Sequence, residues 1–323
     1  MNLYRLPLIA SLLLPCCAAF AQSDAAAEKW LQRIYSAMQQ LSYRGTFVYR
    51  HDDQMETSRV TRLADASGPV EKLEVLDGMP REIVRSRDQV VCYLPSIKTI
   101  KIDNHGSRRQ FPFILPDQLK DLAQNYVVRT GGVERVAGYD CQVIVLEPRD
   151  NLRYGQKLCA DLATGMLLKA KTVNERNEML ETFAFTQLQI GGRVDREQIE
   201  SGFILKSKGW RVEESGATEA DLALAGWTVR SSLPGFHKVT EVTRTLNGAP
   251  GVGHVVFSDG LAAVSVFIES SSARNEIRRP GLSRQGAINV FARKVDSHWV
   301  TVVGEAPARS VELIANAVEH RIP

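Results

Sequence analysis

The stretch that decides the fold is Tyr43-Arg44-Gly45-Thr46-Phe47-Val48-Tyr49-Arg50-His51. Polar and apolar side chains alternate along it with a period of two, and Asp52-Asp53 separates it from another such stretch at residues 55–63. A period of two predicts β-strands. Strands separated by so few residues must pair antiparallel, because a parallel pair needs a long crossover connection. The sequence therefore predicts an antiparallel meander that begins at Tyr43.

The same pattern continues on both sides of a short interruption and predicts a large sheet. Further strands are predicted at residues 70–77, 81–87, 89–94, 98–103, 126–130, 134–136, 139–147, 156–161, 167–174 and 181–190. These segments make a sheet of roughly ten strands or more, and open sheets of that width generally curl.

Two helical segments accompany the predicted sheet. Residues 25–41 carry Trp30, Ile34, Met38 and Leu41 on one helical stripe, and a second, short helix begins at Pro116. A curled sheet with so few helices can enclose a cavity that suits an acyl chain or a peptide. The alternative that the sequence leaves open is that the two helices fill the concave face.

A second, smaller domain follows a linker at residues 206–220. Its predicted strands are residues 237–246, 253–258, 262–269, 286–295 and 298–304, with a tight hairpin turn at Ser258-Asp259-Gly260. Residues 310–321 are predicted to form an amphipathic helix. We expect residues 221–323 to be an α+β domain, in which one helix lies across a small antiparallel sheet.

Residues 1–21 are typical of an export signal. Arg5 precedes an apolar run at residues 6–14, and Ala19-Phe20-Ala21 has the small-x-small pattern that a signal peptidase accepts. Cleavage before Gln22 is expected, and lipidation at Cys16 is the alternative. The apolar run is shorter than the about 20 residues that cross a bilayer. We therefore expect an exported protein that does not span the membrane.

Three cysteines follow the predicted cleavage site: Cys92, Cys141 and Cys159. A hairpin folded about residue 150 places Cys141 directly opposite Cys159, and an exported chain can oxidise such a pair to a disulfide. The alternative is that all the cysteines are buried thiols. We expect no metal site, because neither Cys-x-x-Cys nor His-x-x-x-His spacing occurs.

The sequence lacks the arrangements that are typical of catalysis and of nucleic-acid binding. It contains no Gly-x-Ser-x-Gly nucleophile turn and no dinucleotide-binding glycine motif. Its 40 Lys and Arg residues nearly balance 37 Asp and Glu residues, for a net charge of +3, whereas nucleic-acid binding needs a concentrated cationic face. We therefore expect no catalytic residues, no cofactor and no nucleic-acid partner.

The segment most suggestive of ligand binding is Arg108-Arg109 followed by Phe111-Pro112-Phe113. Paired guanidinium groups beside an apolar loop could bind the phosphate and acyl groups of a lipid. The alternative is a solvated loop whose aromatic side chains pack into the core.

Four segments carry a family resemblance: Tyr43 to Tyr49, Trp-Thr-Val-Arg-Ser-Ser-Leu-Pro-Gly-Phe at 227–236, His-Val-Val-Phe-Ser-Asp-Gly-Leu-Ala-Ala-Val-Ser-Val-Phe-Ile-Glu at 254–269, and Val-Thr-Val-Val-Gly-Glu-Ala-Pro at 300–307. They resemble the RseB/MucB family of periplasmic regulators of the sigma-E (AlgU-type) envelope stress response. The resemblance implies a mainly β protein. Residues 22–205 would form a large, unclosed antiparallel β half-barrel of the LolA/LolB type around helices, and the smaller domain would follow it.

The resemblance also implies a non-enzymatic function in the periplasm. Members of the family bind the periplasmic region of a membrane-spanning anti-sigma factor of the RseA or MucA type and shield it from site-one proteolysis. Lipopolysaccharide or another acylated molecule is thought to release the regulator. A homo-oligomer is compatible with the sequence, and the alternative function is a periplasmic carrier of lipids or lipoproteins.

Two groups of candidate site residues follow from this resemblance. The candidates for binding the acylated signal are Arg108, Arg109, Phe111, Phe113, Phe47 and Tyr49. The candidates for contacting the anti-sigma factor are Trp227, Ser258, Asp259, Gly260 and Leu261. We expect the two ligands to prefer different arrangements of the two domains, so that each ligand weakens the binding of the other.

Overall fold

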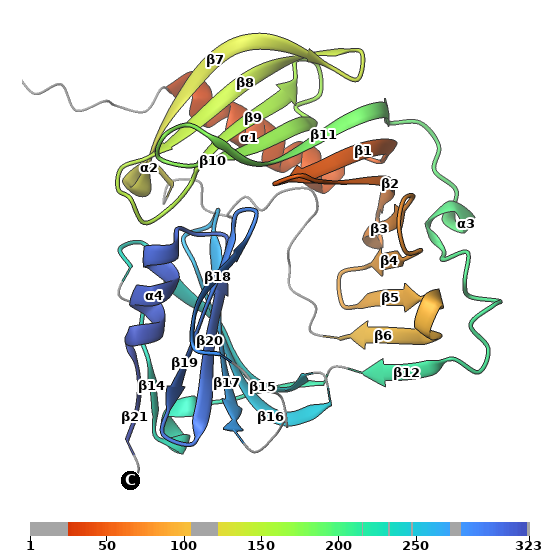
Figure 1. Ribbon diagram of the computed structural model, residues 1–323. Helices are drawn as coiled ribbons and strands as arrows, with labels where there is room; N and C mark the ends of the chain where they lie inside the picture. The colour runs from red at the N-terminus through yellow and green to blue at the C-terminus, as the bar shows by residue number, and fades with distance from the viewer. Residues whose placement is uncertain are drawn as a thin grey trace, which may run out of the picture.

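The protein consists of two β-sheet domains that face each other (Figure 1). The structure is a computed structural model that describes residues 25–104, 122–214, 216–231, 233–246, 248–271 and 279–321. The predicted signal peptide and the predicted lipid-binding residues Arg108, Arg109, Phe111 and Phe113 lie outside the described residues.

The first domain is built on a twelve-stranded sheet, counted over the described ranges, in the order β12-β6-β5-β4-β3-β2-β1-β11-β10-β9-β8-β7. Its strands are β1 (Tyr43–His51), β2 (Gln54–Asp65), β3 (Gly68–Val75), β4 (Glu82–Arg85), β5 (Val90–Leu94), β6 (Thr99–Asp103), β7 (Tyr126–Val136), β8 (Tyr139–Pro148), β9 (Gly155–Asp161), β10 (Leu167–Val173), β11 (Met179–Ile190) and β12 (Arg211–Glu214). All neighbours pair antiparallel except β12, which lies parallel to β6. The predicted meander is confirmed.

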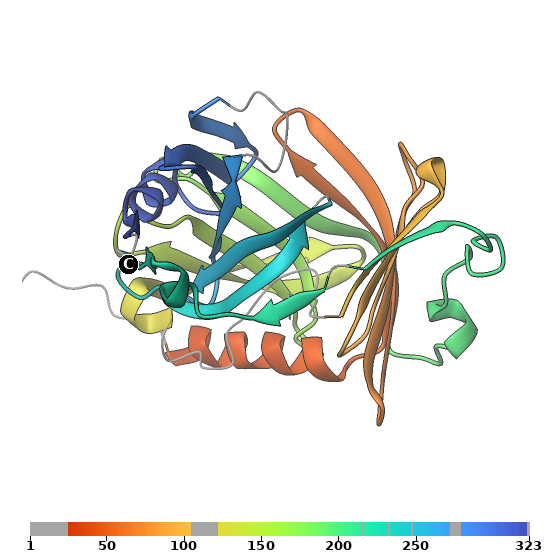
Figure 2. The same ribbon diagram turned by 90° about the horizontal axis from the view of Figure 1, so that it is seen from below.

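The sheet curves around helix α1 (Ala25–Gln40), and a short helix, α2 (Leu122–Asn125), precedes β7. The face of α1 that packs on the sheet carries Ala27, Leu31, Ile34 and Met38, each at most 5% exposed. This stripe differs slightly from the predicted one, since Trp30 lies at its edge. The central carbon of the Arg33 guanidinium lies over the Trp30 ring, 4.0 Å from the ring centre. Seen from below, α1 and the second domain lie on one side of β1 to β6, and α3 (Arg196–Ile199) lies on the other (Figure 2).

A β-bulge between β1 and β11 sets which side chains face the core. Thr46 pairs with Gln187 but Phe47 pairs with Phe185, so β11 has one residue more than β1 at this point. Gly45 allows β1 and β11 to lie close together at the bulge, because a Cβ at that position would lie 2.6 Å from the Gln187 carbonyl oxygen and 2.8 Å from the Phe185 ring. The glycine of the opening motif is therefore needed for close packing rather than for a turn.

A disulfide joins β8 to β9. Cys141 and Cys159 are bonded, with their Cα atoms 5.4 Å apart, and this pair was predicted. The predicted register was wrong, because Cys141 lies opposite Asp161 and Cys159 opposite Val143. The hairpin folds about residue 151 rather than 150, which makes the bonded cysteines diagonal neighbours. Cys92 on β5 is a free, half-buried thiol, and burial raises its pKa.

The predicted linker has structure of its own. Its first part supplies β12 to the edge of the first sheet, and its last part supplies β13 (Ala217–Glu219), which pairs with β15 of the second sheet. The connection between the domains therefore belongs to both sheets.

The second domain contains a seven-stranded antiparallel sheet in the described ranges, in the order β13-β15-β16-β17-β20-β19-β18. Its strands after β13 are β15 (His237–Leu246), β16 (Ala249–Ser258), β17 (Ala263–Ser270), β18 (Gly281–Gln285), β19 (Ile288–Val295) and β20 (His298–Gly304). Helix α4 (Ala308–Asn316) packs on this sheet, and β14 (Trp227–Val229) pairs with β21 (Val318–His320). The expected α+β domain is confirmed.

The predicted helix at residues 310–321 was wrong at its C-terminal end. The helix stops at Asn316, and Val318 begins β21. Arg293 explains the stop, because its guanidinium donates hydrogen bonds to the carbonyl oxygens of Ala315 (2.8 Å) and Val318 (2.5 Å). Val318 is 1% exposed, so the strand buries a β-branched side chain that a continued helix would place elsewhere.

Within the part of the chain that the structure describes, no helix has both the length and the apolar character needed to cross a membrane. The same residues contain no group of three or more His, Cys, Asp or Glu side chains placed to hold a metal ion.

Candidate functional site at the domain junction

The two domains meet around a buried ion pair. Arg153, in the loop between β8 and β9, donates a hydrogen bond to Asp259, in the turn between β16 and β17, with Nη1 and Oδ2 2.8 Å apart. Both side chains are 0% exposed. The Tyr126 hydroxyl also donates to Asp259, at 3.2 Å. An ion pair that is buried away from water in this way is stable only if each charged group keeps several hydrogen-bond partners.

Each charged group of the pair has further hydrogen-bond partners. Asp259 Oδ1 accepts from the backbone N–H groups of Leu261 (3.0 Å) and Ala262 (2.8 Å), which close its own turn. Arg153 makes two bonds of 3.1 Å to the Asp150 carboxylate and donates to the Pro234 carbonyl oxygen at 2.6 Å. The ion pair therefore joins the two domains directly.

Tyr126 and Phe236 form the apolar walls around the Arg153 guanidinium. Its central carbon lies 5.7 Å from the Tyr126 ring centre and 5.2 Å from that of Phe236. Burial, and then the neighbouring Asp259 carboxylate, raise the pKa of Tyr126 well above its ordinary value. Tyr126 therefore stays a neutral hydrogen-bond donor to Asp259.

The motif Leu-Pro-Gly-Phe at 233–236 lies in the same junction. Gly235 has a φ of +76°, and a Cβ there would lie 2.4 Å from the Asn125 side chain. Glycine is thus required both by the backbone conformation and by the close approach of α2. This part of the family resemblance therefore corresponds to contact between the domains.

Further polar contacts extend the junction along α4 and β19. The Ser310 hydroxyl donates to the Leu152 carbonyl oxygen at 2.7 Å, and the Asn289 side chain donates to the Tyr154 hydroxyl at 2.9 Å. Asp52, in the β1–β2 turn, accepts from the Gly286 N–H at 2.7 Å. This hydrogen bond is the main cause that lowers the pKa of Asp52.

Of the predicted partner-binding residues, Asp259 and Leu261 are buried in this junction, and Ser258 and Gly260 are half-buried in the same turn, whereas Trp227 is buried in the core of the second domain, away from the junction. Leu261 is 7% exposed and packs into the core of the first domain. Trp227 is 6% exposed, and its ring stacks on His320 with the ring centres 4.3 Å apart. In this arrangement of the domains, a partner could reach Asp259 and Leu261 only if the junction opened, whereas Trp227 is covered by β21 of its own domain.

The described members of the predicted lipid-binding set, Phe47 and Tyr49, lie on the concave side of the sheet. Phe47 is 3% exposed and packs on Phe183, with the ring centres 4.9 Å apart. Tyr49 is half-buried, and its hydroxyl donates to Glu181 at 2.5 Å. Burial, and then Glu181, raise the pKa of Tyr49 far above its ordinary value. Both side chains are thus occupied by contacts within the domain.

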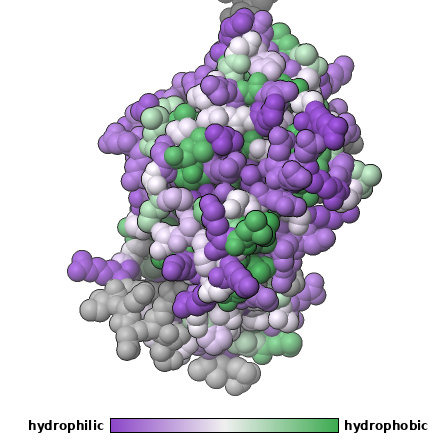
Figure 3. All heavy atoms as spheres, turned by 90° about the vertical axis from the view of Figure 1, so that its right-hand side faces the viewer, coloured by the Kyte–Doolittle hydropathy of each residue, from purple (hydrophilic) through white to green (hydrophobic). Residues whose placement is uncertain are grey.

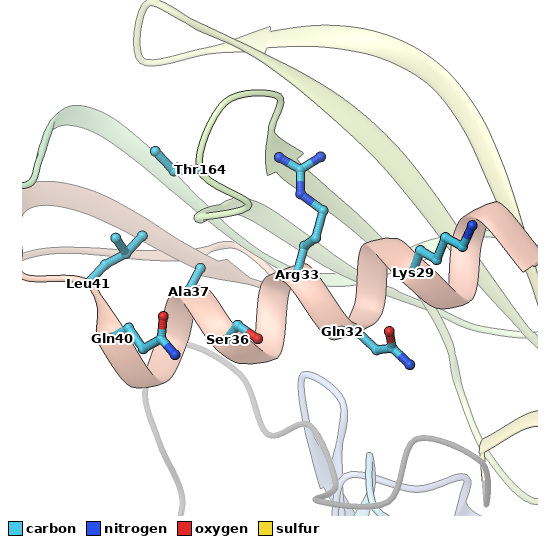
Figure 4. A pocket seen from close by; sticks show the side chains of 8 residues that line it. All are labelled: Lys29, Gln32, Arg33, Ser36, Ala37, Gln40, Leu41 and Thr164. Atoms are coloured by element: carbon cyan, nitrogen blue, oxygen red, sulfur yellow. The ribbon is translucent and has the colours of Figure 1, made fainter.

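Two hollows on the first domain are lined mainly by polar side chains. One lies along α1, where Lys29, Gln32, Arg33, Ser36 and Gln40 line it together with Ala37, Leu41 and Thr164 (Figure 4). Arg33 points from the helix to the β9–β10 turn and donates to the carbonyl oxygens of Leu162 and Ala163. The other hollow lies across β11, β1, β2 and β3. Neither resembles the apolar cavity that the curled sheet led us to expect.

Comparison with known proteins places the chain in a class. Residues 26–203 match the model of the MucB/RseB N-terminal domain, and residues 221–319 match that of the MucB/RseB C-terminal domain. The sigma factor AlgU regulatory protein MucB of Pseudomonas aeruginosa is 31% identical over 304 residues, which cover 92% of each chain. The sigma-E factor regulatory protein RseB of Salmonella typhimurium is 24% identical over 307 residues, with 94% of each chain covered.

A solved structure agrees with this assignment. The crystal structure of MucB in complex with MucA(peri) matches 92% of this chain and 100% of that chain, with a TM-score of 0.69 and 29% sequence identity. A protein with this pair of domains is thus a regulatory protein and not an enzyme. The chain belongs to the MucB/RseB family.

Sequence reasoning missed the residues that hold the domains together. Arg153, Tyr126 and Asn289 were not among the candidates, and Asp259 was a candidate for contact with a different molecule. One signal was present in the sequence: a polar Asp-Gly turn is followed by the apolar Leu261 and Ala262, which is unusual for an exposed hairpin.

Proposed function

We propose that this chain is a periplasmic regulator that binds the periplasmic region of a membrane-spanning anti-sigma factor. The observation that carries the proposal is the likeness over nearly the whole chain to MucB in complex with MucA(peri). That likeness extends over both domains. Binding shields the anti-sigma factor from site-one proteolysis, so that the sigma factor stays sequestered.

Release of the anti-sigma factor follows from a second ligand that prefers another arrangement of the domains. The proposed signal is an acylated envelope molecule such as lipopolysaccharide. A ligand shifts such an equilibrium only by the difference in its affinity for the two arrangements. A tenfold loss of anti-sigma affinity requires a difference of about 1.4 kcal/mol. The junction supports this proposal, since its polar contacts join separate sheets and could be made or broken as one set.

Protease protection tests the shielding directly. The purified periplasmic region of an anti-sigma factor from the same organism is digested by its site-one protease, with and without a saturating amount of this protein. Protection that lipopolysaccharide abolishes is the expected result. Equal cleavage rates with and without the protein would refute the shielding, and protection that lipopolysaccharide leaves unchanged would refute the release step.

A further inference from the structure

The outer face of the first sheet carries a group of cations. Lying opposite one another, in the order of the neighbouring strands β1, β11, β10, β9, β8 and β7, are Arg50, Thr182, Lys171, Lys157, Val145 and Arg129. Lys169 is the next residue on the same side of β10, since side chains alternate along a strand. We call Arg50, Arg129, Lys157, Lys169 and Lys171 the cationic face.

The strand neighbours of these cations show that the cationic face points away from the core. Ala170, between the two lysines of β10, belongs to the hydrophobic core, as does Leu158, beside Lys157. Because side chains alternate, the lysines point to the opposite side of the sheet. The second domain lies on the core side of β7 to β11 (Figures 1 and 2). The cationic face is therefore turned away from the domain junction.

The three lysines of the cationic face lie close enough to affect one another. Burial, and then the neighbouring Lys169 ammonium, lower the pKa of Lys171. The hydrogen bond that Lys169 donates to Glu134, at 2.8 Å, and then the charges of the three lysines, lower the pKa of that carboxyl. Like charges at such short range repel one another, and a bound anion would relieve this repulsion.

The carboxylates of the chain neutralise the cationic face only in part. Glu134 pairs with Lys169, and Glu147 pairs with Arg129. In the described ranges, the remaining cations, Arg50, Lys157 and Lys171, form no salt bridge with a carboxylate. The cationic face thus keeps a local excess of positive charge, although the net charge of the whole chain is only +3.

We propose that the cationic face binds the surface of a bilayer that contains anionic phospholipid. Guanidinium and ammonium groups form charge-assisted hydrogen bonds to phosphate oxygens, and each basic residue near an anionic membrane surface adds to the attraction. The strands that carry the face extend over about 24 Å, from five spacings of about 4.8 Å. Cations spread over such a distance match the many phosphates of a bilayer surface better than they match one small anion.

The attraction is electrostatic rather than hydrophobic. Val145, the apolar side chain between Lys157 and Arg129 in the row, is itself half-buried. Figure 3 shows the adjoining side of the molecule, which carries α3, and hydrophilic residues predominate there too. Because salt screens exposed charges, binding of this kind should weaken as the salt concentration rises.

An acidic peptide fits the cationic face less well than a bilayer does. Peptides bind sheets at an exposed edge or insert apolar anchors into a groove. Of the strands that carry the face, β1 and β8 to β11 are internal to the sheet, so their backbone groups are already paired. The cations of the face line neither of the two hollows described above.

The inference goes beyond the proposed function, because the cationic face shares no residue with the domain junction. A chain that lies on a bilayer by this face keeps its junction on the side away from the lipid. The proposed partner spans a membrane, so a regulator bound to it works beside such a surface. The test itself needs no anti-sigma factor, so its failure would leave the proposed function untouched.

Flotation of the full chain with phospholipid vesicles tests the proposal. Vesicles of equal parts phosphatidylglycerol and phosphatidylcholine are compared with vesicles of phosphatidylcholine alone, at low and at high salt. The test variant is Lys157→Gln combined with Lys171→Gln. The matched control is Lys206→Gln combined with Lys208→Gln, which removes the same charge from exposed residues between α3 and β12. A charge-retaining variant, Lys157→Arg with Lys171→Arg, and thermal unfolding separate a loss of charge from a loss of folding.

Binding to the phosphatidylglycerol vesicles that weakens with rising salt is expected. The affinity should fall about tenfold or more in the test variant and stay unchanged in the matched control and the charge-retaining variant. The proposal fails if neither kind of vesicle binds, if both bind equally, or if the test variant binds like the wild type. It also fails if the matched control, or the folded charge-retaining variant, loses as much affinity as the test variant. Binding of polyglutamate without binding of vesicles would assign the face to an acidic peptide instead.

Discussion

Replacing Asp259 with alanine should destabilise the protein by about 3 kcal/mol. The change removes one partner of an ion pair in which both side chains are 0% exposed, and breaking such pairs costs about 3–5 kcal/mol. The lower end of this range applies because Arg153 keeps its hydrogen bonds to Asp150 and to the Pro234 carbonyl oxygen. The loss includes the hydrogen bond from Tyr126.

Guanidinium denaturation followed by tryptophan fluorescence measures this loss. The matched control is Asp140→Ala, which removes an ion pair with Arg135 whose side chains are 58% and 70% exposed. Exposed pairs contribute about 0–1 kcal/mol, so the control should change little. In an Arg153→Met background, Asp259→Ala should lower the free energy of unfolding by less than it does in the wild type. The reason is that this background has no buried Arg153 charge left without its partner. An effect of Asp259→Ala no larger than that of Asp140→Ala would refute the view that the buried ion pair stabilises the junction.

Other predictions concern the packing, the disulfide and one histidine. Gly45→Ala should cost about 1–3 kcal/mol in unfolding free energy, because its Cβ would meet a backbone carbonyl at 2.6 Å, whereas Gly132→Ala, which faces open space, should cost less than about 1 kcal/mol. Replacing both Cys141 and Cys159 with serine should cost about 3 kcal/mol, as expected for closing a loop with a separation of 18 residues. Burial, and then the neighbouring histidine, lower the pKa of His298, so the unfolded chain binds a proton there at higher pH than the native protein. Stability should therefore fall as the pH drops below about 6.5, and His298→Asn should lessen that fall.

Each of these predictions has an outcome that would contradict it. Equal unfolding free energies for Gly45→Ala and the wild type would mean that the bulge can relax. An unchanged denaturation midpoint in the double serine variant would show that the disulfide adds no stability. For the histidine, unfolding is compared at about pH 7.5 and about pH 5.5, and exposed His237→Asn is the control. A pH dependence of His298→Asn equal to that of the wild type would contradict the linkage.

The sequence predicts most of the strands because their periodicity is a local property. The strands at 43–51, 237–246 and 298–304 were predicted with the observed boundaries. The local sequence pattern does not predict the structure correctly where a residue distant in the sequence determines it. The end of α4 depends on Arg293, which lies on β19, and the cysteine register depends on where one loop folds.

The junction could not be predicted because its partners lie far apart in the sequence. Arg153 and Asp259 are separated by 106 residues, and no periodicity connects them. The resemblance to a known family identified the class of protein, but it could not say that the Asp259 turn is buried between the domains. The polar hollow across β11, β1, β2 and β3 was missed for a similar reason, since its lining residues come together only when these four strands lie side by side.

The most direct test of the account is the affinity of the full chain for the periplasmic region of an anti-sigma factor from its own organism. Isothermal titration calorimetry should show saturable binding that weakens as lipopolysaccharide is added. Absence of binding under conditions in which the protein is folded would contradict the central claim that this chain is an anti-sigma-binding regulator.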